Sequence, residues 1–142
     1  MDFTIPPHIE ALRQQVREFV AEHVMPLEQD AANYDGHENL DERVVAALRE
    51  KAKAAGLWAF QMPKKRGGLD VGVVGMAALY EEASRSPFGP LAFNCSAPDD
   101  GTMILLNKIL SSEQKDRWLQ PLIDGKVRSA FAMTEPDGGC GS

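Results

Sequence analysis

Apolar side chains recur at helical spacing from residue 9 to residue 123, and this period constrains the fold more than any other feature of the chain. The first stripe follows Pro6 and Pro7, which suit an opening helical turn, and it should end or bend at Pro26. Its members are Ile9, Leu12, Val16, Phe19, Val20 and Val24. A second helix is expected from the N-cap residue Asp41 to Gly56, with Val44, Val45, Leu48, Ala52 and Ala55 facing inward.

Three further helices are expected after residue 70. The third spans roughly 71–86, and Gly72 and Gly75 predict close packing of this helix against another element. The fourth should be capped by Asp99 or Asp100 and turn Met103, Leu106, Ile109 and Leu110 inward. The fifth begins with a capping box, Ser111 and Gln114, and should be distorted by Pro121 and ended by Gly125. Its expected buried residues are Trp118, Leu119, Leu122 and Ile123.

Two charged clusters allow either a functional or a structural interpretation. Glu81 and Glu82 could serve as paired acids in acid–base chemistry, and the basic turn at 64–66 could contact a phosphate. Short runs of charge usually face water, however. We therefore expect a solvated helix face at Glu81 and Glu82 and a solvated turn at 64–66.

The last stretch, residues 129–142, differs from the helices before it. Ser129 to Met133 is small and apolar, as in a buried strand, and Pro136 would end any ladder. Glycines at 138, 139 and 141 follow, and such a loop is either a flexible turn or a place to hold a flat ring and a phosphate. Because one strand cannot make a sheet, we expect its partners in a longer architecture, cut just inside a second, β-rich domain.

Composition excludes several classes of function. The net charge of −6 argues against nucleic acid as a partner, and no apolar run approaches the ~20 residues of a membrane span. The first residues do not resemble a signal peptide, and the two cysteines, Cys95 and Cys140, suggest reduced thiols and a cytoplasmic protein. The three histidines lie on separate segments, so no metal site is predicted.

Four segments carry a resemblance to a known family. The most specific is Phe-Ala-Met-Thr-Glu-Pro at 131–136, followed by Gly141 and Ser142. The others are Ser-Glu-Gln-Lys at 112–115 with the run 118–125, Met62 and Pro63 before Gly67 and Gly68, and Asn-Cys-Ser-Ala-Pro-Asp at 94–99. With these segments in this order, essentially the whole chain resembles the N-terminal part of the acyl-CoA dehydrogenases, flavoproteins that oxidise acyl-CoA thioesters.

The resemblance implies an all-α, up-and-down helical domain over residues 1–126, then the first strand and Gly-rich flavin loop of a truncated middle β-domain over residues 127–142. It implies FAD as the cofactor, with Phe131, Met133 and Thr134 lining the isoalloxazine ring. Gly141 and Ser142 would meet the FAD diphosphate region or the substrate. Met103 and Leu106 are candidates for the wall of the acyl cavity, although core packing is the stronger interpretation of both.

The implied reaction is oxidation of acyl-CoA to 2-enoyl-CoA, in which a carboxylate takes the α-proton and a hydride passes from the β-carbon to flavin N5. An electron-transfer flavoprotein would be the acceptor. The family's catalytic glutamate lies in a C-terminal helical bundle, and no residue here matches it, so this chain alone should be inactive. The intact protein would be a dimer or tetramer, while the isolated chain should self-associate through its uncovered strand.

Two alternatives to a dehydrogenase are kept. The chain could be a non-catalytic helical domain that serves association or acyl-CoA binding. It could also come from an acyl-CoA oxidase or a nitroalkane-oxidising relative, which would share the fold and the flavin but differ in reactivity toward oxygen.

Overall fold

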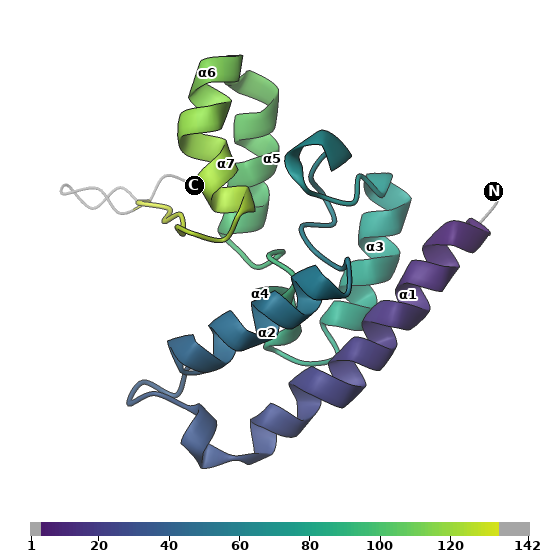
Figure 1. Ribbon diagram of the computed structural model, residues 1–142, viewed down its shortest axis with the longest axis vertical. Helices are drawn as coiled ribbons and strands as arrows, with labels where there is room; N and C mark the ends of the chain where they lie inside the picture. Colours follow the sequence, from purple (N-terminus) through teal and green to yellow (C-terminus); the bar gives the residue numbers. More distant parts are fainter. Residues whose placement is uncertain (1–3, 134–142) are drawn as a thin grey trace.

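The computed structural model describes residues 4–133, and these residues form helices and loops with no β-strand. Figure 1 shows α1 and α3 side by side, and α5, α6 and α7 grouped at one end of the molecule. The predicted all-α class is confirmed. The α-helices are α1 (Pro7–Phe19), α2 (Glu42–Ala54), α3 (Gly72–Ala83), α4 (Gly89–Ala92), α5 (Asp99–Ile109), α6 (Ser112–Gln114) and α7 (Gln120–Ile123).

Two prolines distort helices where the sequence predicts it. The segment η1 (Val20–Val24) is a π-helix that continues α1 and ends two residues before Pro26. The segment η5 (Lys115–Leu119) is also a π-helix, and it ends two residues before Pro121. Proline has no N–H to donate and crowds the preceding turn, so the helix widens locally to accommodate it. Three short 3₁₀ turns complete the helical content, η2 (Met25–Gln29), η3 (Ala31–Asn33) and η4 (Lys64–Arg66).

Most of the predicted helix ends are confirmed. The Asp41 side chain accepts a hydrogen bond from the Arg43 N–H, and both bonds of the Ser111–Gln114 capping box form. Gly56 and Gly125 have positive φ values of 70° and 72°, as glycines that end helices commonly do. The prediction for α5 is wrong, because α5 begins after Pro98 with no side-chain cap.

The core lies between α1, α2, α3 and the loop that contains residues 57–62. The Phe93 ring packs at a tilt against those of Phe19 and Phe60, with ring centroids 5.1 Å apart in both pairs. Gly75 confirms the predicted close packing of α3, since a Cβ there would lie 3.0 Å from Ile9 Cδ1 of α1. Gly75 is buried, whereas Gly72 is exposed.

The inward faces of three helices differ from the prediction at several positions. Leu48, Ala52, Met103, Leu119, Leu122 and Ile123 are buried as expected. Ala55 is exposed, Ile109 is 63% exposed, and Trp118 is 55% exposed with the Arg117 guanidinium 4.7 Å from its ring centroid. The spacing of apolar residues predicts which side of a regular α-helix is buried. A π-helical turn rotates the residues within it relative to that side, which explains why Trp118 points outward.

The predicted strand at 129–133 does not form in this structure. These residues have no regular secondary structure. A strand requires a neighbouring strand to pair its N–H and C=O groups, and residues 4–133 supply none in this region. The remainder of the predicted flavin loop, residues 134–142, lies outside the described residues.

Candidate functional site

The segment of residues 127–133, here called the exit segment, leaves the helical domain beside the first turn of α5. Ser129 donates two hydrogen bonds to Asp99 Oδ1, from its N–H at 2.6 Å and from its Oγ at 2.7 Å. Arg128 Nε donates to Asp99 Oδ2 at 3.3 Å, and Ser129 Oγ lies 3.2 Å from Thr102 Oγ1. Asp99 is only 2% exposed. Its carboxylate binds the exit segment and does not cap α5.

The neighbouring carboxylate, Asp100, points to a different partner. Tyr80 OH donates to Asp100 Oδ1 at 2.7 Å, which ties α5 to α3. Partial burial raises the pKa of Asp100, and the hydrogen bond from Tyr80 opposes that rise. Burial also raises the pKa of the nearby Cys95 thiol, with a smaller contribution from Asp100. A buried cysteine with a raised pKa stays protonated and unreactive, so Cys95 is a packing residue.

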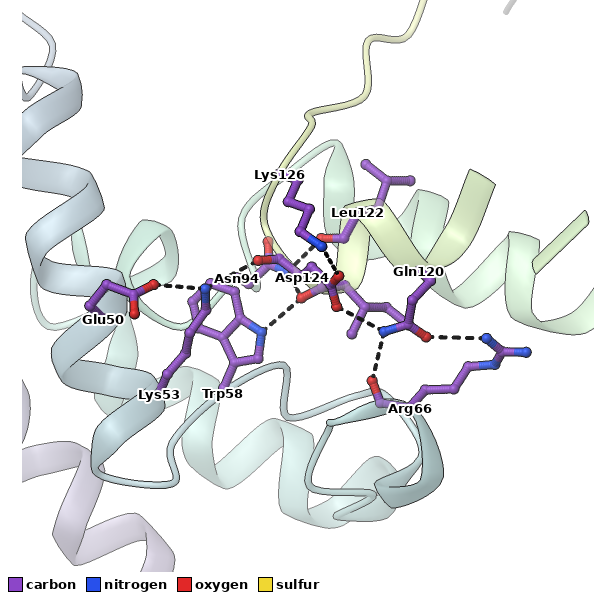
Figure 2. Close-up of polar contacts among 10 residues, drawn as sticks. Glu50, Lys53, Trp58, Arg66, Asn94, Gln120, Leu122, Asp124 and Lys126 are labelled. Carbon is purple, nitrogen blue, oxygen red and sulfur yellow. Dashed lines mark hydrogen bonds and ion pairs between the residues drawn. The ribbon is translucent and has the colours of Figure 1, made fainter. Parts of the chain in front are cut away.

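The end of α7, just before the exit segment, is fixed by buried side chains (Figure 2). Asn94 Nδ2 donates to the carbonyl oxygens of Leu122 at 2.9 Å and Ile123 at 3.2 Å. Trp58 Nε1 donates to the same Ile123 carbonyl at 2.7 Å. The last carbonyls of a helix have no partner within it, and here two core side chains bind them.

A second layer of polar contacts surrounds this helix end. Gln120 Nε2 donates to Asp124 Oδ1 at 2.9 Å and lies 3.2 Å from the Arg66 carbonyl oxygen. Lys53 Nζ donates to the Asp124 carbonyl at 3.2 Å, and Lys126 pairs with the Asp124 carboxylate at 2.8 Å. These contacts are drawn in Figure 2. The point from which the exit segment starts is therefore attached to α2 and to the turn at 64–66.

Two of the three predicted ring-lining residues, Phe131 and Met133, lie on the exit segment. Phe131 is 76% exposed and Met133 is 52% exposed. Thr134, Gly141 and Ser142 lie outside the described residues, so their predicted roles stay predictions. Both described side chains are apolar and open to solvent.

The two substrate candidates lie on α5. Met103 is fully buried, and its sulfur is 3.8 Å from Asn94 Nδ2. Leu106 is half-buried and packs against the core. Within residues 4–133 both side chains therefore have a packing role, and the acyl-wall assignment stays a prediction.

The two charged clusters contradict the expectation of solvated faces in part. Glu82 is 3% exposed and binds the guanidinium groups of Arg13 and Arg17, whereas Glu81 is exposed. In the basic turn Lys64 and Lys65 are exposed, but Arg66 Nη1 pairs with Asp116 at 3.0 Å. Glu82 is buried and Arg66 is half-buried, and both have partners on distant segments, which periodicity within one helix cannot reveal.

A cavity of about 560 Å³ adjoins the exit segment at Arg128. Arg49 also lines it and donates from Nε to the Leu91 carbonyl at 3.1 Å. Burial lowers the pKa of Arg49, and the like charge of Arg128 lowers it further. The same cavity is also lined by three acidic residues, Asp35, Asp41 and Glu42. Because both positive and negative side chains face it, its charge favours neither an anionic nor a cationic ligand.

Two other kinds of site are absent from residues 4–133. No group of three His, Cys, Asp or Glu residues in this part of the chain could hold a metal ion. None of its helices is both long enough and apolar enough to cross a membrane. The candidate site is therefore the exit segment together with Asp99 and Thr102 of α5, the two residues that bind it.

Sequence reasoning did not identify Asp99, Thr102, Arg128 and Ser129 as a unit. Asp99 was assigned to a cap because aspartate is common at helix starts. Its partner lies 30 residues away in the sequence. The one feature of the sequence that points to a second role is the presence of two adjacent aspartates at 99 and 100, since a helix cap needs only one carboxylate.

Comparison with known proteins identifies the family. Residues 6–126 match the family model described as "Acyl-CoA dehydrogenase, N-terminal domain". The chain is 40% identical over 129 residues to acyl-CoA dehydrogenase family member 11 of Gallus gallus, which covers 87% of this chain and 16% of that protein. It is 33% identical over 140 residues to FadE2 of Mycobacterium tuberculosis, described as a probable acyl-CoA dehydrogenase, covering 96% of this chain and 34% of that protein.

A solved structure shows the same arrangement of helices. It is described as the "structure of a putative acyl-CoA dehydrogenase from Mycobacterium abscessus", and the TM-score is 0.81 at 37% identity. The match covers 96% of this chain and 36% of the other, so the chain spans about a third of that protein. The chain belongs to the acyl-CoA dehydrogenase family and contains its N-terminal domain.

Proposed function

We propose that this chain is the N-terminal helical domain of an FAD-dependent acyl-CoA dehydrogenase that converts acyl-CoA to 2-enoyl-CoA. Family membership supports the reaction class, and the exit segment supports the cofactor. The single observation that carries the cofactor assignment is the pair of solvent-exposed apolar side chains, Phe131 and Met133, placed two residues apart beyond the bonded Ser129.

These residues fit a flat aromatic ring. Phe131 and Met133 offer apolar, polarizable surfaces, which are suited to contact with the isoalloxazine system. When bound, FAD would supply the acceptor for the hydride that leaves the β-carbon of the substrate. Phe131 and Met133 would exclude water from one side of the ring, and the Thr134 hydroxyl would bond its pyrimidine side. Gly141 and Ser142 would contact the diphosphate region or the substrate.

Neither of the two buried carboxylates in residues 4–133, Glu82 and Asp99, is free to take the α-proton. Glu82 is buried between arginines of α1 and is not available to a substrate. Asp99 is occupied by Ser129 and Arg128. The base would come from the remainder of the protein, as would the surfaces that bind the electron-transfer flavoprotein and form a dimer or tetramer. A cytoplasmic location is proposed, supported by the free thiol of Cys95.

The test is expression of the chain together with the sequence that follows it in its gene. The purified protein should carry FAD, with flavin absorption bands that bleach when an acyl-CoA is added without oxygen or acceptor. A protein that folds but takes up no flavin would rule out the proposal. Rapid reoxidation by oxygen after bleaching would instead indicate an acyl-CoA oxidase.

The second candidate is a non-catalytic domain of the same fold that binds acyl-CoA or another protein. The exposed apolar exit segment would suit association as well as a cofactor. Acyl-CoA binding without flavin uptake or bleaching would favour this candidate.

The isolated chain of 142 residues is expected to self-associate. The reason is the exposure of Val127, Phe131 and Met133 on one segment, rather than a strand edge. Sedimentation velocity should show a sedimentation coefficient that rises with protein concentration. Phe131→Ser with Met133→Ser should abolish the rise.

A matched control for this experiment is the pair Val73→Ser and Val74→Ser. These valines of α3 are 82% and 61% exposed, but they lie far from the exit segment in the sequence. Their replacement should leave the association unchanged. A wild-type chain that sediments as a monomer at all concentrations would contradict the prediction.

A further inference from the structure

We propose that Asp99 is a positioning residue for the cofactor site, acting through Ser129 on the residues that would meet the flavin. The proposal rests on the proposed function, because it concerns how tightly FAD is held. It assigns a role in cofactor binding to a carboxylate that the family motif at 131–136 does not include.

The Asp99 carboxylate accepts hydrogen bonds from the start of the exit segment. Both carboxylate oxygens are used, Oδ1 for the N–H and Oγ of Ser129, and Oδ2 for Arg128 Nε. The side chain is 2% exposed, so these donors replace water almost completely. A buried carboxylate without its donors would be strongly unfavourable, which makes release of the segment costly.

Ser129 is the last point at which the described chain is held. Residues 130–133 make no hydrogen bond or ion pair with another described residue. Phe131 and Met133 follow Ser129 by two and four residues and are both exposed. The point from which these residues leave the domain is therefore set at Ser129, and Asp99 holds Ser129 there.

Asp99 and Thr102 lie on a well-packed helix. Asp99 is the first residue of α5, and the Met103 side chain of the same helix is fully buried. Thr102, one turn along α5, contacts the Ser129 hydroxyl at 3.2 Å. A fixed base of this kind can hold a ligand-binding segment in one orientation and so reduce the entropy lost on binding.

The first test measures the restraint itself, without any cofactor. Asp99→Ala should accelerate amide hydrogen exchange at Ser129 in the 142-residue chain by about tenfold or more, the value of roughly one strong hydrogen bond. Asp99→Asn keeps an oxygen that can accept the Ser129 N–H, so it should give a smaller increase. Asp100→Asn is the matched control, since it changes the adjacent carboxylate on the same helical turn and should leave exchange at Ser129 unchanged.

The second test measures cofactor affinity in the protein that includes the sequence following this chain. The apoprotein is titrated with FAD, and binding is followed by flavin fluorescence and by the shape of the flavin absorption bands. Asp99→Ala should weaken binding by about tenfold, and Asp99→Asn and Ser129→Ala by less. Asp100→Asn should bind FAD like the wild type, and circular dichroism should show that each variant is folded.

The outcomes separate this proposal from the proposed function. Wild-type protein that binds no FAD would overturn the proposed function, and with it the role of Asp99 toward a flavin, even if exchange at Ser129 depends on Asp99. Wild-type protein that binds FAD with an affinity and spectrum unaffected by Asp99→Ala would overturn the positioning role alone. Equal weakening by Asp99→Ala and Asp100→Asn would also overturn it, because the effect would then be a general loss of stability.

Discussion

Glu82→Gln is expected to lower the free energy of unfolding by about 2–3 kcal/mol at neutral pH. The carboxylate is 3% exposed and accepts hydrogen bonds from Arg13 Nε at 3.0 Å, Arg17 Nε at 3.0 Å and Arg17 Nη2 at 2.6 Å. Glutamine has the same shape but no charge, and its amide nitrogen would face guanidinium donors. Urea unfolding followed by circular dichroism measures the change.

The effect should depend on pH with a definite sign. Hydrogen bonds from Arg17 lower the pKa of Glu82 most strongly, and Arg13 lowers it further, against the opposing effect of burial. A carboxyl group with a lowered pKa in the folded state stabilises the protein above its unfolded pKa, near 4.3, and loses that contribution as the pH falls through the folded value. The gap between wild type and Glu82→Gln should therefore be constant from pH 7 to about pH 5 and shrink in more acidic solution.

Glu81→Gln is the matched control, because Glu81 is the adjacent residue on α3 with the same chemistry. Its side chain is 69% exposed and lies 3.4 Å from Arg13. Exposed pairs contribute little, so this change should cost at most about 0.5 kcal/mol. Equal effects of the two substitutions would show that burial between the arginines does not stabilise the fold.

Glu81 and Glu82 differ in burial although they are adjacent and chemically alike, and the sequence alone does not predict this difference. Features that depend on a few adjacent residues were predicted correctly, including the Ser111–Gln114 capping box, the distortions before Pro26 and Pro121, and Gly56 as a helix end. Their physical causes lie within one or two turns. The burial of Glu82 depends on α1, which is more than sixty residues away in the sequence, so no local pattern could distinguish it from Glu81.

The candidate site was predictable to a similar extent. The motif predicts Phe131 and Met133 as flavin contacts, and this role stays a prediction; the structure places both on a solvent-exposed segment. The sequence shows Asp99 as an acid at a helix start but does not show its role. An aspartate that caps its helix and one that binds the N–H of a distant residue have the same local sequence. Only the folded chain brings Ser129 to α5.

Asn94→Asp is expected to have the largest effect of any single substitution considered, about 4 kcal/mol of unfolding free energy. Asn94 is 2% exposed, and its Nδ2 donates to the carbonyl oxygens of Leu122 and Ile123. A carboxylate in that position cannot donate and would place a negative charge against two carbonyl oxygens. Because the total stability of a domain is about 5–15 kcal/mol, much of it would be lost.

The fluorescence of Trp58 offers a local measurement. Its indole N–H binds the same Ile123 carbonyl at 2.7 Å, and the residue is 7% exposed. Unfolding by urea should change this emission at a lower midpoint in Asn94→Asp than in wild type. Asn107→Asp, which adds the same charge at a half-buried position of α5, is the control and should shift the midpoint only slightly.

Three substitutions at Asn94 separate the contributions of charge, hydrogen bonds and backbone. Asn94 has a φ of 57°, a conformation that asparagine and glycine tolerate better than alanine. Asn94→Gly keeps the backbone conformation and removes the amide, so it should be less destabilising than Asn94→Ala. The loss in Asn94→Asp should become smaller in acid, because the protonated carboxyl can donate to a carbonyl, while the losses in the other two should not. If all three variants lost the same stability at every pH, the hydrogen bonds to the end of α7 would not be what Asn94 contributes.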